Sequence, residues 1–85
     1  MKYPMYSYRD NKVGFMPPQC DQSDAAAIRG FSYAVNGNNG MMGFAPQDFD
    51  LYKVGEFDTD KGTIKSCTPV LVVSGMSVFN EKVGE

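Results

Sequence analysis

LYKVGEFDTDKGTIKSC, residues 51–67, is the stretch that decides the fold of this chain. It predicts a β-hairpin in which residues 51–57 form one strand, residues 63–67 form the next, and Asp58–Gly62 makes the turn. Gly62 suits the left-handed backbone position that such a turn requires. Because strands joined by a short turn pair antiparallel, we expect an antiparallel sheet.

Side-chain alternation along residues 51–57 indicates which face of this strand is buried. We expect Leu51 and Phe57 to pack under a helix, although Lys53 shares their nominal face. A buried face does not accommodate a lysine, so a bulge near Gly55 or a position at the rim is required. The opposite face is expected to carry Tyr52, Val54 and Glu56.

Two strands are predicted near the start of the chain. Residues 3–9 alternate with a period of two, and Pro4 places this strand at an edge of the sheet because proline cannot donate a ladder hydrogen bond. Asp10–Lys12 is expected to turn the chain, and residues 13–16 return as a second strand. Pro17 and Pro18 end it.

One helix is predicted after these strands. Ser23 or Asp21 caps its first turn, where Asp24 is favoured by the helix dipole, and Ala25–Ala27 are strong helix formers. Asn36–Gly37 supplies a left-handed stop. The apolar stripe that faces the sheet is expected to contain Ile28, Phe31 and Val35, widened by Ala27 and Ala34.

The remaining segments complete an α+β fold. Residues 37–45 are rich in Gly and Asn and are expected to form a loop, and residues 46–48 a single helical turn. Pro69 is expected to stop the fourth strand, after which residues 70–73 form a possible fifth. The predicted order is β-β-α-β-β, with one antiparallel sheet, one helix packed on one face, a single domain over residues 1–79 and a frayed tail over residues 80–85.

Size and charge limit the function. A chain of 85 residues has a thin core, so self-association into a homodimer is a reasonable way to bury more surface. Its net charge of −2 counts against strong nucleic-acid binding, although a local basic patch can differ from the whole. The longest apolar run, residues 70–73, is too short to span a membrane, so we expect no membrane partner.

No motif in the chain specifies a reaction, a metal or a cofactor. The sequence contains no histidine and no closely spaced cysteine pair, so we expect no zinc site. A disulfide between Cys20 and Cys67 is an alternative, but in a reducing cytosol we expect two free thiols. Asp58–Gly62 lacks the ligand spacing of a calcium loop, and Gly37–Gly43 lacks the ending of a phosphate loop. We therefore expect a protein that is not an enzyme and has no cofactor.

Aromatic and basic side chains suggest a binding surface instead. Rings that stack on bases, interleaved with cations that follow phosphates, are typical of sequence-tolerant single-strand binders. The alternative is that these tyrosines are ordinary strand residues, since one face of the sheet must be buried. The candidate nucleic-acid-binding residues are Tyr6, Tyr8, Arg9, Lys12, Tyr52, Lys53 and Lys65.

Five sequence elements resemble one phage family in their order and spacing. They are Met1–Tyr3 with Met5–Ser7, Asp10–Gly14, Pro17–Pro18, Ala27–Ser32 with Ala34–Asn36, and Leu51–Asp58. The family is the small non-structural protein of gokushovirus-type microviruses, phages with small circular single-stranded DNA genomes. The resemblance covers about residues 1–67, and the Asn- and Met-rich residues 37–43 depart from it.

The resemblance implies a non-structural protein of the bacterial host cytoplasm. Such a protein would bind single-stranded DNA during genome replication, or during the switch to single-strand synthesis and packaging. It carries no catalytic residues. The other hypothesis is a dimeric interaction module that docks on a phage or host replication or capsid protein without binding nucleic acid. Inhibition of a host defence or host polymerase is a variant of this second hypothesis.

Overall fold

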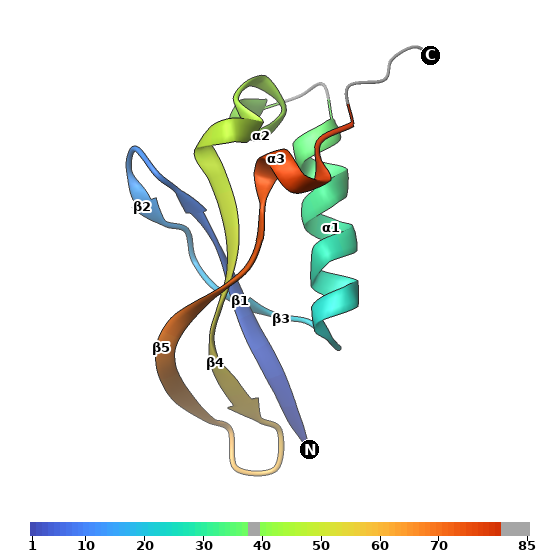
Figure 1. Cartoon of the computed structure of the whole chain (residues 1–85). Helices are drawn as coiled ribbons and strands as arrows, with labels where there is room; N and C mark the ends of the chain where they lie inside the picture. Colours follow the sequence, from blue (N-terminus) through green and yellow to red (C-terminus); the bar gives the residue numbers. More distant parts are fainter. Residues whose placement is uncertain (38–39, 81–85) are drawn as a thin grey trace.

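A computed structural model describes residues 1–37 and 40–80 of the chain (Figure 1). Its elements are β1 (Lys2–Asp10), β2 (Gly14–Phe15), β3 (Gln19–Cys20), α1 (Asp24–Asn36), α2 (Gly40–Phe44), the 3-10 helix η1 (Pro46–Asp48), β4 (Phe49–Asp58), β5 (Thr63–Ser74) and α3 (Gly75–Val78).

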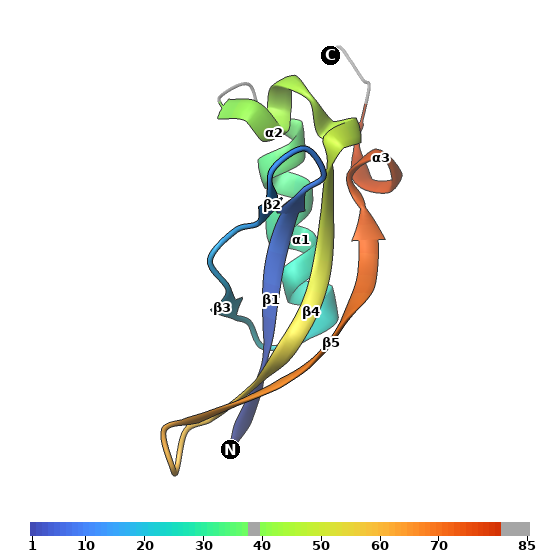
Figure 2. The same ribbon diagram turned by 90° about the vertical axis from the view of Figure 1, so that its left-hand side faces the viewer.

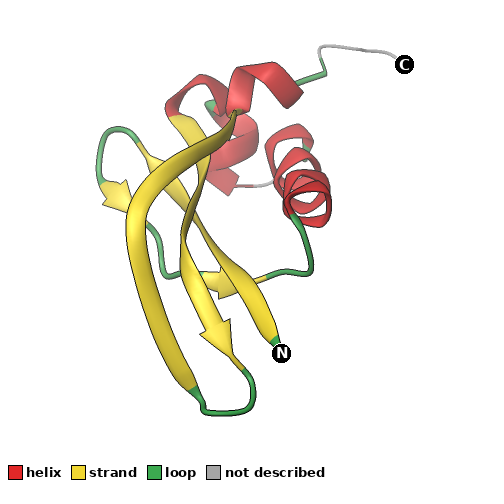
Figure 3. Cartoon of the chain, turned by 60° about the horizontal axis from the view of Figure 1, so that its bottom comes forward, coloured by secondary structure: helices red, strands yellow, loops and turns green. Residues whose placement is uncertain are grey.

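The strands form one antiparallel sheet in the order β2-β1-β4-β5, and β3 also pairs with β1. Helix α1 lies along one face of this sheet, while α2 and α3 gather at its upper end (Figure 1, Figure 3). The predicted α+β architecture is therefore confirmed.

The core lies between α1 and the upper part of the sheet. Ala27, Phe31 and Val35 of α1 are buried, as the apolar stripe predicted, and they pack on Tyr6 and Leu51. The Ser23 side chain accepts a hydrogen bond of 3.2 Å from the Ala26 N–H, which confirms the predicted cap.

The prediction that the first strand is an edge strand was wrong, because β1 has neighbours on both sides. Pro4 is tolerated because the N and C=O groups of one strand residue point to the same side. The Pro4 carbonyl accepts from the Asp21 N–H at 3.1 Å, so the Pro4 nitrogen also points away from β4. On that side β3 has already ended at Cys20, and no ladder donor is required from Pro4.

Pro69 does not stop a strand, since β5 runs unbroken past it and takes in the predicted fifth strand. The pairing of β5 with β4 shifts from Ser66 opposite Gly55 to Val70 opposite Lys53. Pro69 lies inside this irregular stretch, where the ladder requires no hydrogen-bond donor from it.

Two further predictions near the end of α1 need correction. Gly37 has φ −74° and ψ 160°, so it is not the left-handed residue that was expected there. The Asn36 side chain instead donates to the Ser32 carbonyl at 2.8 Å and to the Val78 carbonyl at 2.9 Å. Residues 40–44 form helix α2 rather than a loop, because Met42 packs against the core. Residues 38–39 of the predicted loop, and 81–85 of the predicted tail, lie outside the described residues.

The predicted bulge is present, and it reverses the faces of the residues that follow it. Met5 pairs with Gly55 and Tyr6 pairs with Lys53, so Val54 is the extra residue. Phe57 was predicted to pack under the helix with Leu51, but the bulge turns it to the opposite face. The same reversal moves Glu56 onto the helix side, where Lys53 already lies.

Candidate nucleic-acid interface

Helix α1 covers only the upper half of the sheet face on which it lies. Its first turn lies over Tyr6, whose hydroxyl donates a hydrogen bond to the Asp24 carboxylate. Below Tyr6 the β4–β5 hairpin continues past the end of α1 (Figure 1, Figure 2). The lower half of the helix-side face is therefore left without a helix on it.

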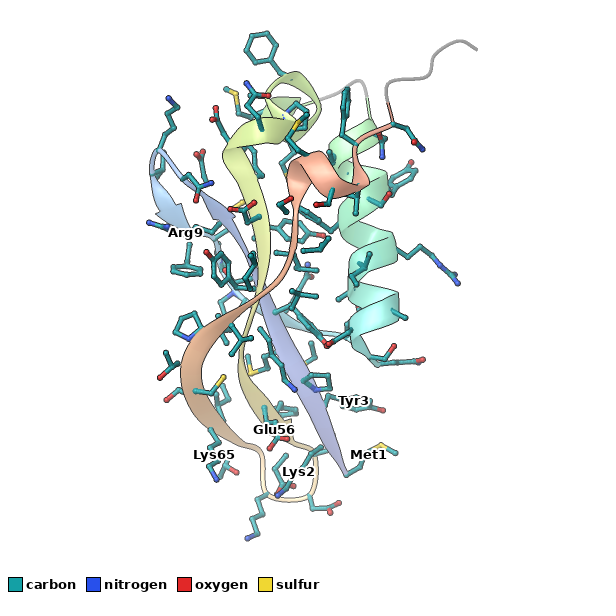
Figure 4. The ribbon with its side chains drawn as sticks, viewed as in Figure 1. Met1, Lys2, Tyr3, Arg9, Glu56 and Lys65 are labelled. Carbon is teal, nitrogen blue, oxygen red and sulfur yellow. The ribbon has the colours of Figure 1, made fainter. Side chains whose placement is uncertain are left out.

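This uncovered half carries four lysines, which we call the lysine surface: Lys2 of β1, Lys53 of β4, Lys61 of the hairpin turn and Lys65 of β5. Lys2 pairs with Asp58 across the β1–β4 ladder, and Lys65 pairs with Glu56 across the β4–β5 ladder. Figure 4 shows Lys2, Glu56 and Lys65 close to one another at the lower end of the sheet.

Two adjoining hollows lie on the lysine surface. The larger, of about 280 Å³, lies where β5 departs from regular pairing and is lined by Lys53, Cys67 and Val70 among others. The smaller, of about 100 Å³, is lined by Lys2 and Lys61 among others. Glu56 and Lys65 line both hollows, so the two are neighbours, and together we call them the trough.

The lysines of this surface are not neutralised by ion pairs. Across residues 1–37 and 40–80, the only ion pair within 4 Å joins the N-terminal ammonium to Asp60 at 2.9 Å. The Asp58 carboxylate accepts the backbone N–H groups of Asp60 at 2.9 Å and Lys61 at 3.3 Å. The Asp60 hydrogen bond is the largest cause of a lowered Asp58 pKa, with smaller effects from Lys61, the N-terminus and Lys2.

Charge is therefore distributed unevenly in a chain whose net charge is −2. The lysine surface holds half of the eight basic residues, whereas three of the ten acidic residues, Glu56, Asp58 and Asp60, lie beside it, and Asp60 is paired with the N-terminal ammonium. The remaining surface is correspondingly more acidic. A local excess of ammonium groups around a trough attracts phosphate groups even when the whole protein is acidic.

The seven residues predicted to share one aromatic and basic face do not share it. Tyr6 and Tyr8 lie under α1, where Tyr6 is buried and the Tyr8 ring packs on Phe31 with centroids 5.2 Å apart. Burial raises the pKa of both tyrosines, and for Tyr6 the hydrogen bond to Asp24 adds to this effect. Tyr6 therefore belongs to the core, and Tyr8 is partly buried against it.

The other five predicted residues are divided among three places. Lys53 and Lys65 belong to the lysine surface, and Lys12 is exposed in the turn between β1 and β2. Arg9 and Tyr52 lie on the face of the sheet away from α1, which we call the open face (Figure 4). There Phe15 contacts both, with the Arg9 guanidinium carbon 5.2 Å from its ring centre and the Tyr52 ring edge-on.

Sequence reasoning missed Lys2, Lys61 and Phe15. Lys2 and Lys61 looked like terminal and turn residues, and only the pairing of β1 and β5 with β4 brings them together. Lys2 could have been found from the sequence, because it is an even number of residues from Tyr6 and side chains at such a spacing lie on the same face of a strand.

The structure contains a further large hollow. A hollow of about 410 Å³ at the upper end is lined by Met16, Met41 and Met42 among others. No three potential metal-ligating side chains gather anywhere in residues 1–37 and 40–80. None of the helices in these described segments has the length and apolar character needed to cross a membrane.

Comparison with known proteins gives one result. A family model described as "Phage ORF5 protein" matches residues 3–78, which include every strand and helix described above except Lys2 at the start of β1. Neither the curated proteins nor the solved structures contain a match to the chain.

Proposed function

The chain belongs to the Phage ORF5 protein family, and we propose that it is a non-enzymatic, non-structural phage protein that binds single-stranded DNA through its lysine surface. The gokushovirus-type resemblance assigns this binding to genome replication, or to the switch to single-strand synthesis and packaging. The site of action would be the cytoplasm of a bacterial host.

One observation carries this proposal: the uncovered half of the helix-side face holds four lysines without ion pairs among the described residues. No helix covers this half of the face, and Lys2, Lys61 and Lys65 are exposed there, so their side chains are available for a ligand. Ammonium groups of lysine bind phosphate oxygens as point charges, which suits contact with a DNA backbone.

The shape of the trough favours a single strand over a duplex. The larger hollow, of about 280 Å³, has the Val70 side chain and the Gly55 backbone in its wall beside the lysines. An unpaired base can enter such a hollow while neighbouring phosphates lie against the ammonium groups. In a duplex the base faces are stacked inside the helix and are not available to it.

Binding of this kind depends strongly on salt. If all four lysines contact phosphates, the logarithm of the association constant falls with that of the salt concentration with a slope of about −3 for single strands. A fourfold rise in salt would then weaken binding about 50-fold. The affinity should depend little on base sequence, because the four lysines contact the backbone rather than the base edges.

Fluorescence anisotropy of a labelled oligonucleotide, titrated at several salt concentrations, tests the proposal. Lys65→Ala and Lys2→Ala should each weaken binding and reduce the magnitude of the slope by about 0.7. Lys12→Ala is the matched control, because Lys12 is an exposed lysine at the opposite end of the sheet. No binding near physiological salt, or equal losses in all three variants, would contradict the proposal.

The second candidate is an interaction module that docks on a phage or host replication or capsid protein. The methionine-lined hollow at the upper end favours it, because methionine side chains adapt to varied apolar partners. Phe44 of α2 is 83% exposed at the same end of the molecule. This candidate predicts co-purification with a protein and no response of the lysine variants in the oligonucleotide titration.

A further inference from the structure

The open face of the sheet is apolar where an exposed face is usually polar. Antiparallel sheets with one face in water normally carry polar side chains there. Here Phe15 is 48% exposed, Leu71 53% and Ile64 65%. Tyr52 pairs with Leu71, and Phe57 pairs with Ile64, so the apolar side chains follow the sheet along its length. Figure 2 looks onto this face and shows α1 behind the strands.

Two opposite charges lie side by side on the open face. Arg9 and Asp50 are direct partners across the β1–β4 ladder, yet they form no ion pair within 4 Å. The Asn11 side chain contacts both: it donates to the Asp50 carboxylate at 3.0 Å and accepts from Arg9 at 3.5 Å. Within the described residues the Arg9 Nε has no hydrogen-bond partner.

An apolar face with one cation beside one anion has the features that binding to a copy of itself requires. In a two-fold dimer the same patch meets itself, so a residue at one position contacts a second position and the reverse. A patch with one cation and one anion satisfies this condition, because each charge faces its opposite on the other copy. Aromatic residues and arginine are also enriched in protein interfaces, and Arg9, Phe15 and Tyr52 already form one cluster.

We propose that the open face binds the open face of a second copy of this chain, with Arg9 of each copy against Asp50 of the other. Nucleic acid is a poorer occupant, since Asp50 would repel phosphates and Arg9 is the one cation in the cluster. By dimerising in this way, a chain of this size buries apolar surface that its thin core cannot bury. The lysine surface lies on the other face of the sheet, so a dimer would leave the lysine surfaces of both copies exposed.

The mass of the full chain in solution, measured by light scattering over a dilution series, tests this proposal. We expect twice the monomer mass of 9.4 kDa at high concentration, falling towards the monomer on dilution. A monomer at every concentration from micromolar to millimolar would overturn the proposal. This measurement needs no DNA, so its failure would leave the lysine surface as proposed.

Two charge reversals test the geometry. Arg9→Glu gives each copy two anions at the contact, and Asp50→Lys gives each copy two cations, so each variant alone should dimerise about tenfold more weakly. Mixing the two variants pairs opposite charges at both contacts and should restore the dimer. A mixture that stays as monomeric as its components would overturn the assigned contact.

A third variant keeps the proposal testable if the charge reversals impair folding. Leu71→Lys changes a side chain that is already half exposed, so the monomer should fold, as circular dichroism would show. It should weaken the dimer about tenfold or more. Phe44→Lys is the matched control on α2 and should leave the mass unchanged. Equal effects of the two variants would count against the open face.

Discussion

The upper and lower halves of the helix-side face are built from the same strands, but they differ in chemistry. In the upper half Tyr6, Phe49 and Leu51 are buried against α1. In the lower half Lys2 and Lys65 occupy equivalent positions of β1 and β5 with no helix over them. The end of α1 therefore separates residues that pack in the core from residues that no helix covers.

The bulge at Val54 marks the boundary between these halves. It is what places Glu56, rather than Phe57, beside Lys53 and Lys65 on the helix side. Without it Phe57 would lie on the helix side of the sheet, where no helix covers it. The division of the sheet therefore depends on one extra residue in β4 as much as on the helix.

The largest loss of stability is expected from a substitution in the upper half of the helix-side face. Phe31→Ala removes a ring that is fully buried between α1 and Tyr8, and should lower the free energy of unfolding by about 3–5 kcal/mol. Urea denaturation followed by circular dichroism measures this loss. Tyr33→Ala, at an 84% exposed position of the same helix, should change it by no more than about 0.5 kcal/mol. Similar losses would mean that α1 is not packed as described.

The next largest loss of stability is expected at Gly55, beside the bulge that separates the two halves. A Cβ atom on Gly55 would lie 2.6 Å from the Lys65 carbonyl oxygen, so Gly55→Ala must push β5 away from β4. We expect a loss of about 1–3 kcal/mol in unfolding free energy, together with weaker DNA binding. Gly30→Ala in α1 is the control with the opposite sign, since the nearest atom lies at 4.0 Å and alanine favours a helix by about 0.5–1 kcal/mol. A neutral Gly55→Ala would argue against the close approach of the strands.

A smaller loss of stability is expected at Tyr6, which lies just above the bulge. Tyr6→Phe removes the hydrogen bond to Asp24 and should cost about 1 kcal/mol at neutral pH. Because the pKa of Tyr6 is raised above 10.0 in the folded state, the stability that this group contributes is complete below pH 10 and falls as the pH rises further. The wild type should therefore lose stability above pH 10 more steeply than the variant, in denaturation curves measured at several pH values. Parallel curves would contradict this.

The smallest effect on stability should be found in the lower half. Lys65→Ala should change the unfolding free energy by no more than about 0.5 kcal/mol, because its side chain is exposed and unpaired in the described structure. The same variant should nevertheless reduce the salt dependence of DNA binding. A large loss of stability would show that the lysine surface has a structural role, and the distinction between the halves would fail.

The sequence predicted the helix and the hairpin, and it offered Ser23 as one of two caps and the bulge as one of two ways to accommodate Lys53, because each depends on neighbours along the chain. It did not predict that Pro69 lies within a continuous strand, since that depends on irregular pairing with β4. The candidate site was predicted only in part for the same reason. Lys53 and Lys65 were found, but Tyr6 and Tyr8 could be assigned to the core only once the face covered by α1 was known.

The most direct test of the central claim is a map of amide chemical shifts in the labelled protein on titration with a short single-stranded oligonucleotide. We expect the shifts to concentrate at Lys2, at residues 53–56 and at residues 61–65, and to shrink with added salt. Residues of α1 should change little. Shifts centred on Phe15 and Tyr52 of the open face, or no shifts at all, would contradict it.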